Sequence, residues 1–383
     1  MKNFNLDAIL EAMLKVSDRV SDLNFSVGRP PQVEVDGQLV PVNFPGLPRL
    51  TPFQTEMIAM HMLRGDRDLT RTLMTNGSVD LSYSIPQKTR FRVNIFAQRG
   101  TYAIVLRVIP EGVPSLESLK LPRELWNIPG LKNGIVLVTG PTGSGKSTTL
   151  AAIINEINQN HAYHIITIED PVEYMHKHVK STVNQREVGS DTRTFSLALR
   201  AALRQAPKVI LIGEMRDVET IEIAMEAAET GHLVLSTLHT IDAAKTVDRI
   251  IGVFPKDQEP QIRTRLSQSF RYVISQRLLP KIGGGRIAAL EILKSTMRTR
   301  DYVVKGESEG RSLVDAMHDG SVDGMQTFDD EIEKLWQNRV ISKETALAYA
   351  TNPVNLALRL TDEPEGGESS LESDGDSMLS MLE

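Results

Sequence analysis

The sequence predicts an α/β protein in which a domain built on a parallel sheet follows a small α+β domain. Residues 140–147 read G-x-x-x-x-G-K-S, a phosphate-binding loop between a short apolar run and a stretch of helical spacing. After residue 125, apolar runs alternate with helical stretches, which is typical of parallel strands joined by crossover helices. The first 110 residues instead contain short alternating runs bounded by turn residues, which indicates strands of a different kind of sheet.

In the N-terminal domain, residues 1–111, an Asp36-Gly37 turn between two alternating runs predicts a hairpin. Glu-Gly-Val-Pro-Ser at 111–115 interrupts the pattern, and we place an interdomain linker at residues 112–121. The pattern predicts helices over residues 6–16 and 52–63, and strands over residues 21–27, 32–35, 38–42, 79–84, 90–97 and 101–109.

The C-terminal domain, residues 122–360, contains the alternating apolar strands and helices. We predict its strands over residues 135–139, 165–168, 209–212 and 233–236, and a mainly helical part over residues 286–360. Residues 361–383 are rich in Gly, Ser and Glu, which predicts an acidic, disordered tail.

Composition narrows the classes of function. The chain has no cysteine, which excludes disulfides and cysteine-ligated metal sites and fits a reducing, cytoplasmic compartment. No run of about 18 apolar residues predicts a transmembrane segment, and the N-terminus lacks the apolar core of a signal peptide. The net charge is −6, and removing the eight acidic residues of the tail leaves +2 on residues 1–360. A body so close to neutral disfavours a nucleic-acid partner.

The residues of the loop have separate tasks. The glycines allow the backbone to close around phosphate oxygens, Lys146 supplies a positive charge for them, and the Ser147 hydroxyl is a ligand for Mg²⁺. We therefore predict a nucleoside triphosphate site formed by Gly140, Pro141, Thr142, Gly143, Ser144, Gly145, Lys146, Ser147 and Thr148.

Two acidic clusters follow predicted strands. The first places Glu169, Asp170 and Glu173 around a proline turn after the strand at 165–168. The second places Glu214 after the strand at 209–212, with Gly213 where a Walker B strand usually has an aspartate. Phosphoryl transfer to water needs carboxylates to hold Mg²⁺ and to orient or deprotonate the water, so we expect both clusters to meet the loop.

Two histidines bracket the strand at 233–236. His232 and His239 are seven residues apart, which places them at opposite ends and on opposite faces of a strand. They therefore cannot both bind one metal ion without a bend, and we expect a phosphate-sensing or coupling role instead.

In their order and spacing, the four clusters resemble the secretion ATPase superfamily. Residues 169–173 match its Asp box, residues 209–217 its atypical Walker B segment, and residues 230–240 its His box. Within it the chain resembles the type IV pilus retraction ATPases, the PilT/PilU family. Stretches that match this family outside the loop are residues 183–189, 198–205, 276–280 and 324–329.

This resemblance implies a PAS-like N-terminal domain, a RecA-like P-loop ATPase domain and a ring of six subunits with ATP between the two domains. Glu173 corresponds to the family's proposed general base, with Glu169 as the second choice, and Glu214 would bind Mg²⁺ directly or through water. Arg92 and Arg107 match family positions whose guanidinium groups, from a neighbouring subunit, would reach the phosphates; Arg90 and Arg99 are competitors.

The resemblance also implies a cytoplasmic motor at the inner membrane that acts on a pilus platform protein and powers retraction and twitching motility. Residues 296–307 depart from the PilT pattern, and with the acidic tail they look more like PilU, the accessory retraction motor. A second retraction ATPase is therefore an expected partner.

Three alternatives remain. The chain could be an extension or type II secretion ATPase, although such relatives usually have an extra N-terminal domain and a four-cysteine metal site. It could be an accessory ATP-binding subunit with little hydrolysis of its own. A nucleic-acid translocase is disfavoured because no basic, aromatic-laced stretch is present.

Overall fold

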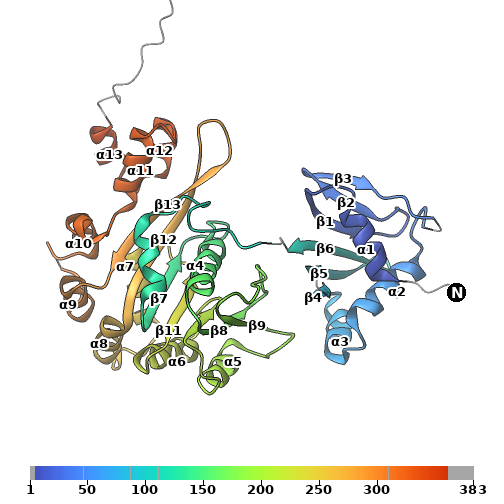
Figure 1. Ribbon diagram of the computed structural model, residues 1–383, viewed down its shortest axis with the longest axis horizontal. Coiled ribbons are helices and arrows are strands. Elements are labelled where there is room, and N and C mark those ends of the chain that lie inside the picture. The colour runs from blue at the N-terminus through green and yellow to red at the C-terminus, as the bar shows by residue number, and fades with distance from the viewer. Residues whose placement is uncertain (1–4, 46, 87, 110–111, 309, 361–383) are drawn as a thin grey trace, which may run out of the picture.

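A computed structural model describes residues 5–360 of the chain, except residues 46, 87, 110–111 and 309. Two bodies are visible in Figure 1: a smaller one from the N-terminal part and a larger one built on a second sheet. The predicted tail at 361–383 and the first residue of the Glu-Gly-Val-Pro-Ser segment at 111–115 lie outside the described residues. Among the described residues, no helix is both long and apolar enough to cross a lipid bilayer.

The N-terminal domain is a six-stranded antiparallel sheet in the order β3-β2-β1-β6-β5-β4. Its strands are β1 (Val20–Phe25), β2 (Gln32–Val35), β3 (Gln38–Pro41), β4 (Ser78–Ile85), β5 (Thr89–Gln98) and β6 (Thr101–Ile109). Its helices are α1 (Leu6–Leu14), α2 (Pro52–Leu63) and α3 (Arg67–Asn76). Apolar side chains of the sheet and helices form one core, which includes the fully buried Phe25 and Phe91.

The predicted elements of this domain form close to their expected bounds. The Asp36-Gly37 hairpin joins β2 to β3, and both turn residues have positive φ, as a tight hairpin turn requires. Helix α3 was missed because its residues are mostly polar, and only Leu73 of it is buried.

The C-terminal domain has a seven-stranded sheet in the order β13-β12-β7-β11-β10-β8-β9. All neighbours pair in parallel except β12 and β13, which pair antiparallel. The strands are β7 (Gly134–Thr139), β8 (His164–Glu169), β9 (Thr182–Glu187), β10 (Val209–Ile212), β11 (Leu233–Leu238), β12 (Phe270–Pro280) and β13 (Arg286–Lys294). The parallel sheet predicted from the apolar runs is therefore present, within a mixed α/β fold.

Helices cover both faces of this sheet and bury its central strands, which is why β7, β10 and β11 have no exposed residue. The helices are α4 (Lys146–Asn160), α5 (Phe195–Ala202), α6 (Val218–Glu229), α7 (Ala243–Gly252), α8 (Glu259–Ser269), α9 (Met297–Lys305), α10 (Leu313–Asp319), α11 (Phe328–Gln337), α12 (Lys343–Tyr349) and α13 (Pro353–Arg359), with short 3₁₀ helices at Arg123–Gly130 and Ser321–Asp323.

The prediction that residues 286–360 are mainly helical is wrong at its start. Residues Arg286–Lys294 form β13, which pairs antiparallel with β12. Most of its side chains are buried. A nearly continuous apolar run of this length fits a buried strand as well as a helix, so spacing alone could not separate them.

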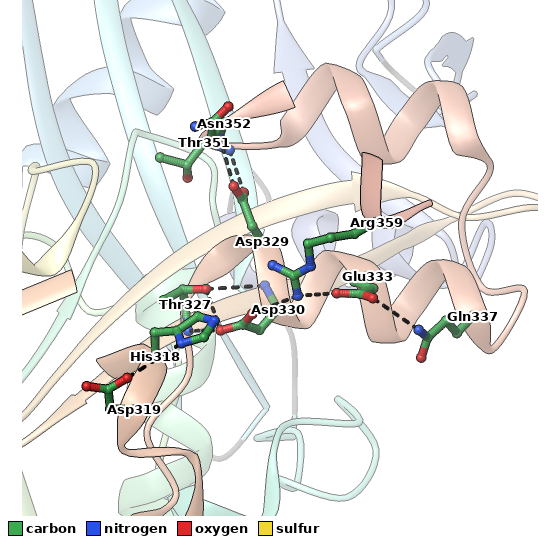
Figure 2. Close-up of polar contacts among 10 residues, drawn as sticks. All are labelled: His318, Asp319, Thr327, Asp329, Asp330, Glu333, Gln337, Thr351, Asn352 and Arg359. Carbon is green, nitrogen blue, oxygen red and sulfur yellow. Dashed lines mark hydrogen bonds and ion pairs between the residues drawn. The ribbon is translucent and has the colours of Figure 1, made fainter. Parts of the chain in front are cut away.

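Helices α11, α12 and α13 form a cap at the far end of β12, held by polar contacts as well as by a small apolar core. Figure 2 shows Asp329 accepting hydrogen bonds from the backbone N–H groups of Thr351 and Asn352, at 2.6 and 2.9 Å. Arg359 of α13 pairs with both Asp330 and Glu333 of α11. These contacts fix the last two helices against α11.

The two domains meet through a partly buried ion pair. Arg90 of β5 donates from Nη2 to Glu187 of β9 at 2.8 Å, and their side chains are 19% and 4% exposed. The same Glu187 carboxylate accepts the backbone N–H of Val172 at 3.0 Å. Glu187 therefore links the N-terminal domain to the acidic turn, residues 169–173, at the end of β8.

Candidate active site

The phosphate-binding loop leaves β7 and ends in the first turn of α4. Gly145 has a φ of 88°, a left-handed conformation that residues with a side chain rarely adopt. A Cβ atom on Gly140 would lie 2.5 Å from the carbonyl oxygen of Gln276, so a side chain does not fit there. The loop backbone thus packs directly against β12, and the loop lies at the positive end of the α4 dipole, which favours an anion.

Lys146 folds back over this loop. Its Nζ donates to the carbonyl oxygens of Gly140 and Pro141, each at 3.0 Å. Burial lowers the pKa of Lys146, and the charges of Glu173 and Glu214 oppose that shift. The ammonium group therefore lies between the loop carbonyls and two carboxylates, where an incoming phosphate could replace the carbonyl contacts.

A cavity of about 600 Å³ opens beside the loop. Its walls come from the loop and α4, from the carboxyl ends of β8, β10 and β11, and from β5 of the N-terminal domain. This is the edge at which parallel α/β sheets bind ligands. The charged and polar residues that line the cavity include Arg92, Lys146, Ser147, Glu169, Asp170, Glu173, Glu214 and His239.

The two candidate bases in the acidic turn have different surroundings. Glu169 accepts hydrogen bonds from Thr167 Oγ1 at 2.6 Å and from Gln185 Nε2 at 3.2 Å, and burial raises its pKa. Glu173 is exposed on the cavity wall, and its charge reaches Lys146. Glu169 is therefore held by the sheet, whereas Glu173 faces the space where a water molecule and phosphates would meet.

Glu214 lies two residues after the end of β10, and its side chain is 15% exposed. Its Oε2 lies 2.6 Å from Arg216 Nε and 3.4 Å from His239 Nε2. A Cβ atom on Gly213 would lie 3.3 Å from the Cα of Glu169 and from the carbonyl oxygen of Ile168. Strand β8 thus approaches position 213 closely, and the carboxylate of this segment stands one residue later, at position 214.

The two histidines lie at opposite ends of β11, as their spacing predicts. His239 lines the cavity, whereas His232 Nδ1 lies 2.9 Å from the carbonyl oxygen of Ala227, at the other edge of the sheet. Among the described residues, no group of three or more His, Cys, Asp or Glu side chains could hold a metal ion.

The four candidate arginines lie in different surroundings. Arg92 lines the main cavity of its own chain, and Arg107 lines a smaller adjoining cavity of about 260 Å³. Arg107 Nε donates to Asp22 at 3.0 Å, on the neighbouring strand β1. Arg90 is engaged with Glu187, and Arg99 lies in the turn between β5 and β6. Of these four candidates, Arg92 is the one that lines the main cavity, whose wall also includes Arg216 and Arg286.

Sequence reasoning did not single out Tyr174. Its OH lies 3.0 Å from Thr148 Oγ1 and ties residues 170–174 to the start of α4. Position near a predicted site residue was the available signal for Tyr174, and it applied equally to its neighbours. Asp170 belongs to the first acidic cluster of the sequence analysis and lines the cavity; burial, followed by the charge of Glu214, raises its pKa.

These residues fit a nucleoside triphosphate with Mg²⁺. Substituents on Gly140 and Gly145 would collide with β12, and the cavity lies beside the loop, lined by Gly143, Gly145, Lys146 and Ser147. Ser147 and the carboxylates of Asp170 and Glu214 supply oxygen atoms, which Mg²⁺ prefers. Mg²⁺ in such sites is bound by one or two protein groups together with substrate phosphates, so no cage of three carboxylates is needed.

Residues 35–323 match the family model described as Type II/IV secretion system protein. The chain is 44% identical over 338 residues to the type IV pilus retraction ATPase PilT of Pseudomonas aeruginosa, covering 88% of this chain and 96% of that protein. It is 40% identical over 355 residues to the type IV pilus ATPase PilU of the same organism, covering 92% and 91%. A crystal structure of the pilus retraction motor PilT with bound ADP matches with a TM-score of 0.81 at 43% identity, covering 93% of this chain and 100% of that one.

Proposed function

The chain belongs to the Type II/IV secretion system protein family and, within it, to the PilT/PilU-type pilus ATPases, and from this premise we propose that it hydrolyses ATP to drive retraction of type IV pili. The observation that carries the proposal is the cavity in which Lys146, Glu173 and Glu214 face one another beside the phosphate-binding loop. The same cavity takes Arg92 from the other domain, so nucleotide would touch both domains at once.

Each group has a role that its position supports. Lys146 and the loop N–H groups would bind the phosphates, and Ser147 and Glu214 would hold Mg²⁺. Glu173 orients the attacking water and accepts its proton, because it is exposed toward the cavity, while Glu169 holds the turn in place. The guanidinium of Arg92 stabilises charge that develops on the transferring phosphoryl group. Mg²⁺, when bound, neutralises part of the phosphate charge.

Hydrolysis would produce motion by changing the angle between the two domains. Arg92 is carried by β5, and Arg90 on the same strand is tied to Glu187 in the larger domain. Loss of the terminal phosphate removes the ligand that Arg92 binds, which favours a different domain angle about the linker near residues 111–115.

In the cell, the motor would be a ring of six subunits on the cytoplasmic side of the inner membrane, where it would turn a pilus platform protein. The altered helix at 296–307 supports the PilU subtype and a second retraction ATPase as partner. The identities of 44% to PilT and 40% to PilU are close to each other, and the subtype is part of this proposal.

Deletion of the gene in its host tests the proposal. Cells without a retraction motor should carry extra surface pili and move poorly on surfaces, and wild-type protein, but not the Lys146→Ala variant, should restore movement. Bald cells would support an extension motor instead. Purified wild-type protein and the Glu214→Ala variant should differ in steady-state ATP hydrolysis; equal rates would support an accessory subunit with little hydrolysis.

A further inference from the structure

Strand β12 places one buried polar side chain directly behind the phosphate-binding loop. Gln276 is 2% exposed and follows Ser275, the last residue of β12 that pairs with β7. Its Nε2 donates to the carbonyl oxygen of Ser144 at 2.7 Å, and its Oε1 accepts from Thr149 Oγ1 at 2.7 Å. The amide therefore joins the loop to the first turn of α4, on either side of Lys146.

The orientation of this amide follows from its partners. The carbonyl oxygen of Ser144 can only accept a hydrogen bond, so the NH₂ group must face it and the amide oxygen must face Thr149. Both hydrogen bonds are buried, and an apolar side chain at position 276 would leave the Ser144 carbonyl without this donor. Gln276 is thus matched to the loop rather than to the apolar core around it.

The hydrogen bond to Ser144 fixes more than one atom. The C=O and N–H groups of a trans peptide point in opposite directions. A Ser144 carbonyl held toward β12 therefore turns the N–H of Gly145 away from β12, to the cavity side of the loop. That N–H lies at the start of α4, where the helix dipole favours negative charge.

The loop glycines fit closely around the same residue. A Cβ atom on Gly145 would lie 2.8 Å from Gln276 Nε2, and one on Gly140 would lie 2.5 Å from the Gln276 carbonyl oxygen. Gln276 thus contacts both ends of the glycine-rich segment. Movement of its side chain would free the segment to change conformation.

We propose that Gln276 is a positioning residue for the phosphate-binding loop, whose side-chain amide holds the Ser144–Gly145 peptide with its N–H group facing the nucleotide phosphates. This role rests on the proposed ATP hydrolysis at the loop. It acts equally on bound ATP and on the transition state, so its loss should raise KM for ATP more than it lowers kcat.

Two substitutions at this position test the role. Gln276→Glu keeps the size and the acceptor for Thr149, but an ionised carboxylate cannot donate to the Ser144 carbonyl. Gln276→Met removes both hydrogen bonds without adding charge. This second variant tests the same role if the buried carboxylate of Gln276→Glu prevents folding. We expect each variant to raise KM for ATP and the Kd of ADP at least tenfold, with kcat changed less than threefold.

Gln326 offers a matched control in the same domain. It is 9% exposed, and its Nε2 donates to the backbone carbonyl oxygen of Leu290 at 2.8 Å, on the β13 side of the sheet and away from the loop. Gln326→Glu and Gln326→Met should lower the melting temperature as the Gln276 variants do, with KM and Kd within twofold of wild type.

Two outcomes would overturn the role of Gln276. One is a KM and an ADP Kd within twofold of wild type in both Gln276 variants. The other is an equal loss of nucleotide affinity in the Gln326 variants, which would show a general effect of a damaged sheet. A wild-type protein that binds ADP without hydrolysing ATP would contradict the proposed function instead, and the ADP comparison would then decide the role of Gln276.

Discussion

His239 Nε2 lies 3.4 Å from the Glu214 carboxylate, so the end of β11 meets the end of β10 at the acid expected to hold Mg²⁺. A second contact joins the two strand ends, because the Thr237 side-chain hydroxyl donates to the carbonyl oxygen of Gly213 at 2.6 Å. His239 is therefore placed to respond to whatever Glu214 binds. His232, at the other end of the same strand, is not.

The first prediction follows from this separation. His239→Ala should lower kcat for ATP hydrolysis about tenfold, because it removes the imidazole that lies 3.4 Å from the Glu214 carboxylate without removing the carboxylate. His232→Ala loses a contact to the Ala227 carbonyl outside the cavity and should keep kcat within twofold of wild type. Phosphate release measured at saturating ATP compares the two; a larger loss in His232→Ala would contradict the assignment.

The second prediction separates the two candidate bases. Glu173→Gln should lower kcat by about 100-fold or more, since general base catalysis is worth that much and an amide cannot accept the proton. Glu169→Gln should lower it less than tenfold, because the amide oxygen can still accept from Thr167. Binding of a fluorescent ADP analogue should persist in both variants. A larger loss of kcat in Glu169→Gln would exchange the two roles.

The third prediction concerns the origin of the guanidinium group. Sequence reasoning expected arginines from a neighbouring subunit, whereas Arg92 lines the cavity beside the loop of its own chain. The Arg92→Ala variant should lose ATP turnover and retain nucleotide binding. The Lys146→Ala variant should also lose ATP turnover. If Arg92 acts within its own chain, a mixture of the two variants should stay inactive, because no site then has both residues.

If Arg92 acts across a subunit boundary, the same mixture should recover activity, since a Lys146→Ala subunit could supply Arg92 to its neighbour. Mixing each variant with wild type shows whether subunits exchange. Asp22→Asn provides the control for Arg107, because it removes the charge paired with that guanidinium and leaves the cavity of Arg92 intact.

Much of the fold could be predicted because its signals are local. Val209–Ile212 forms β10 with the expected bounds, and Pro52–Leu63 forms α2, since an apolar run and a proline at the first helical turn suffice to define them. Strand β12 was missed because it contains Ser275, Gln276 and Arg277, which read as a polar interruption.

The polarity of β12 is explained by contacts that are distant in sequence. Ser275 Oγ accepts a hydrogen bond from Thr139 Oγ1. Gln276 Nε2 donates one to the carbonyl oxygen of Ser144, 132 residues earlier in the chain. Arg277 lies 3.7 Å over the ring of Phe328 and donates to the carbonyl oxygen of Tyr349. No periodicity within one segment could predict such pairs, because each side chain is satisfied by a different part of the fold.

The fourth prediction concerns a buried carboxyl that the proposed reaction does not use. Glu291 of β13 is 4% exposed, and its Oε1 accepts the backbone N–H of Ala243 at the start of α7, at 2.7 Å. Burial raises its pKa from 4.5 to about 7; Asp242 adds to this shift, while Ala243, Arg277 and Ser275 oppose it. The folded protein therefore retains a proton that the unfolded chain releases.

A raised pKa in the folded state stabilises the fold fully below pH 4.5, and this stabilisation is lost as pH rises through about 7. At about 1.4 kcal/mol per pH unit, the loss is on the order of 3 kcal/mol. Glutamine at this position cannot titrate and can still accept from Ala243. The unfolding free energy of Glu291→Gln relative to wild type should thus increase from pH 5 to pH 7 and then stay constant, as measured by urea unfolding. Glu222→Gln, on the exposed face of α6, controls for the change in net charge, and a difference between Glu291→Gln and wild type that does not vary with pH would show that Glu291 stays ionised in the fold.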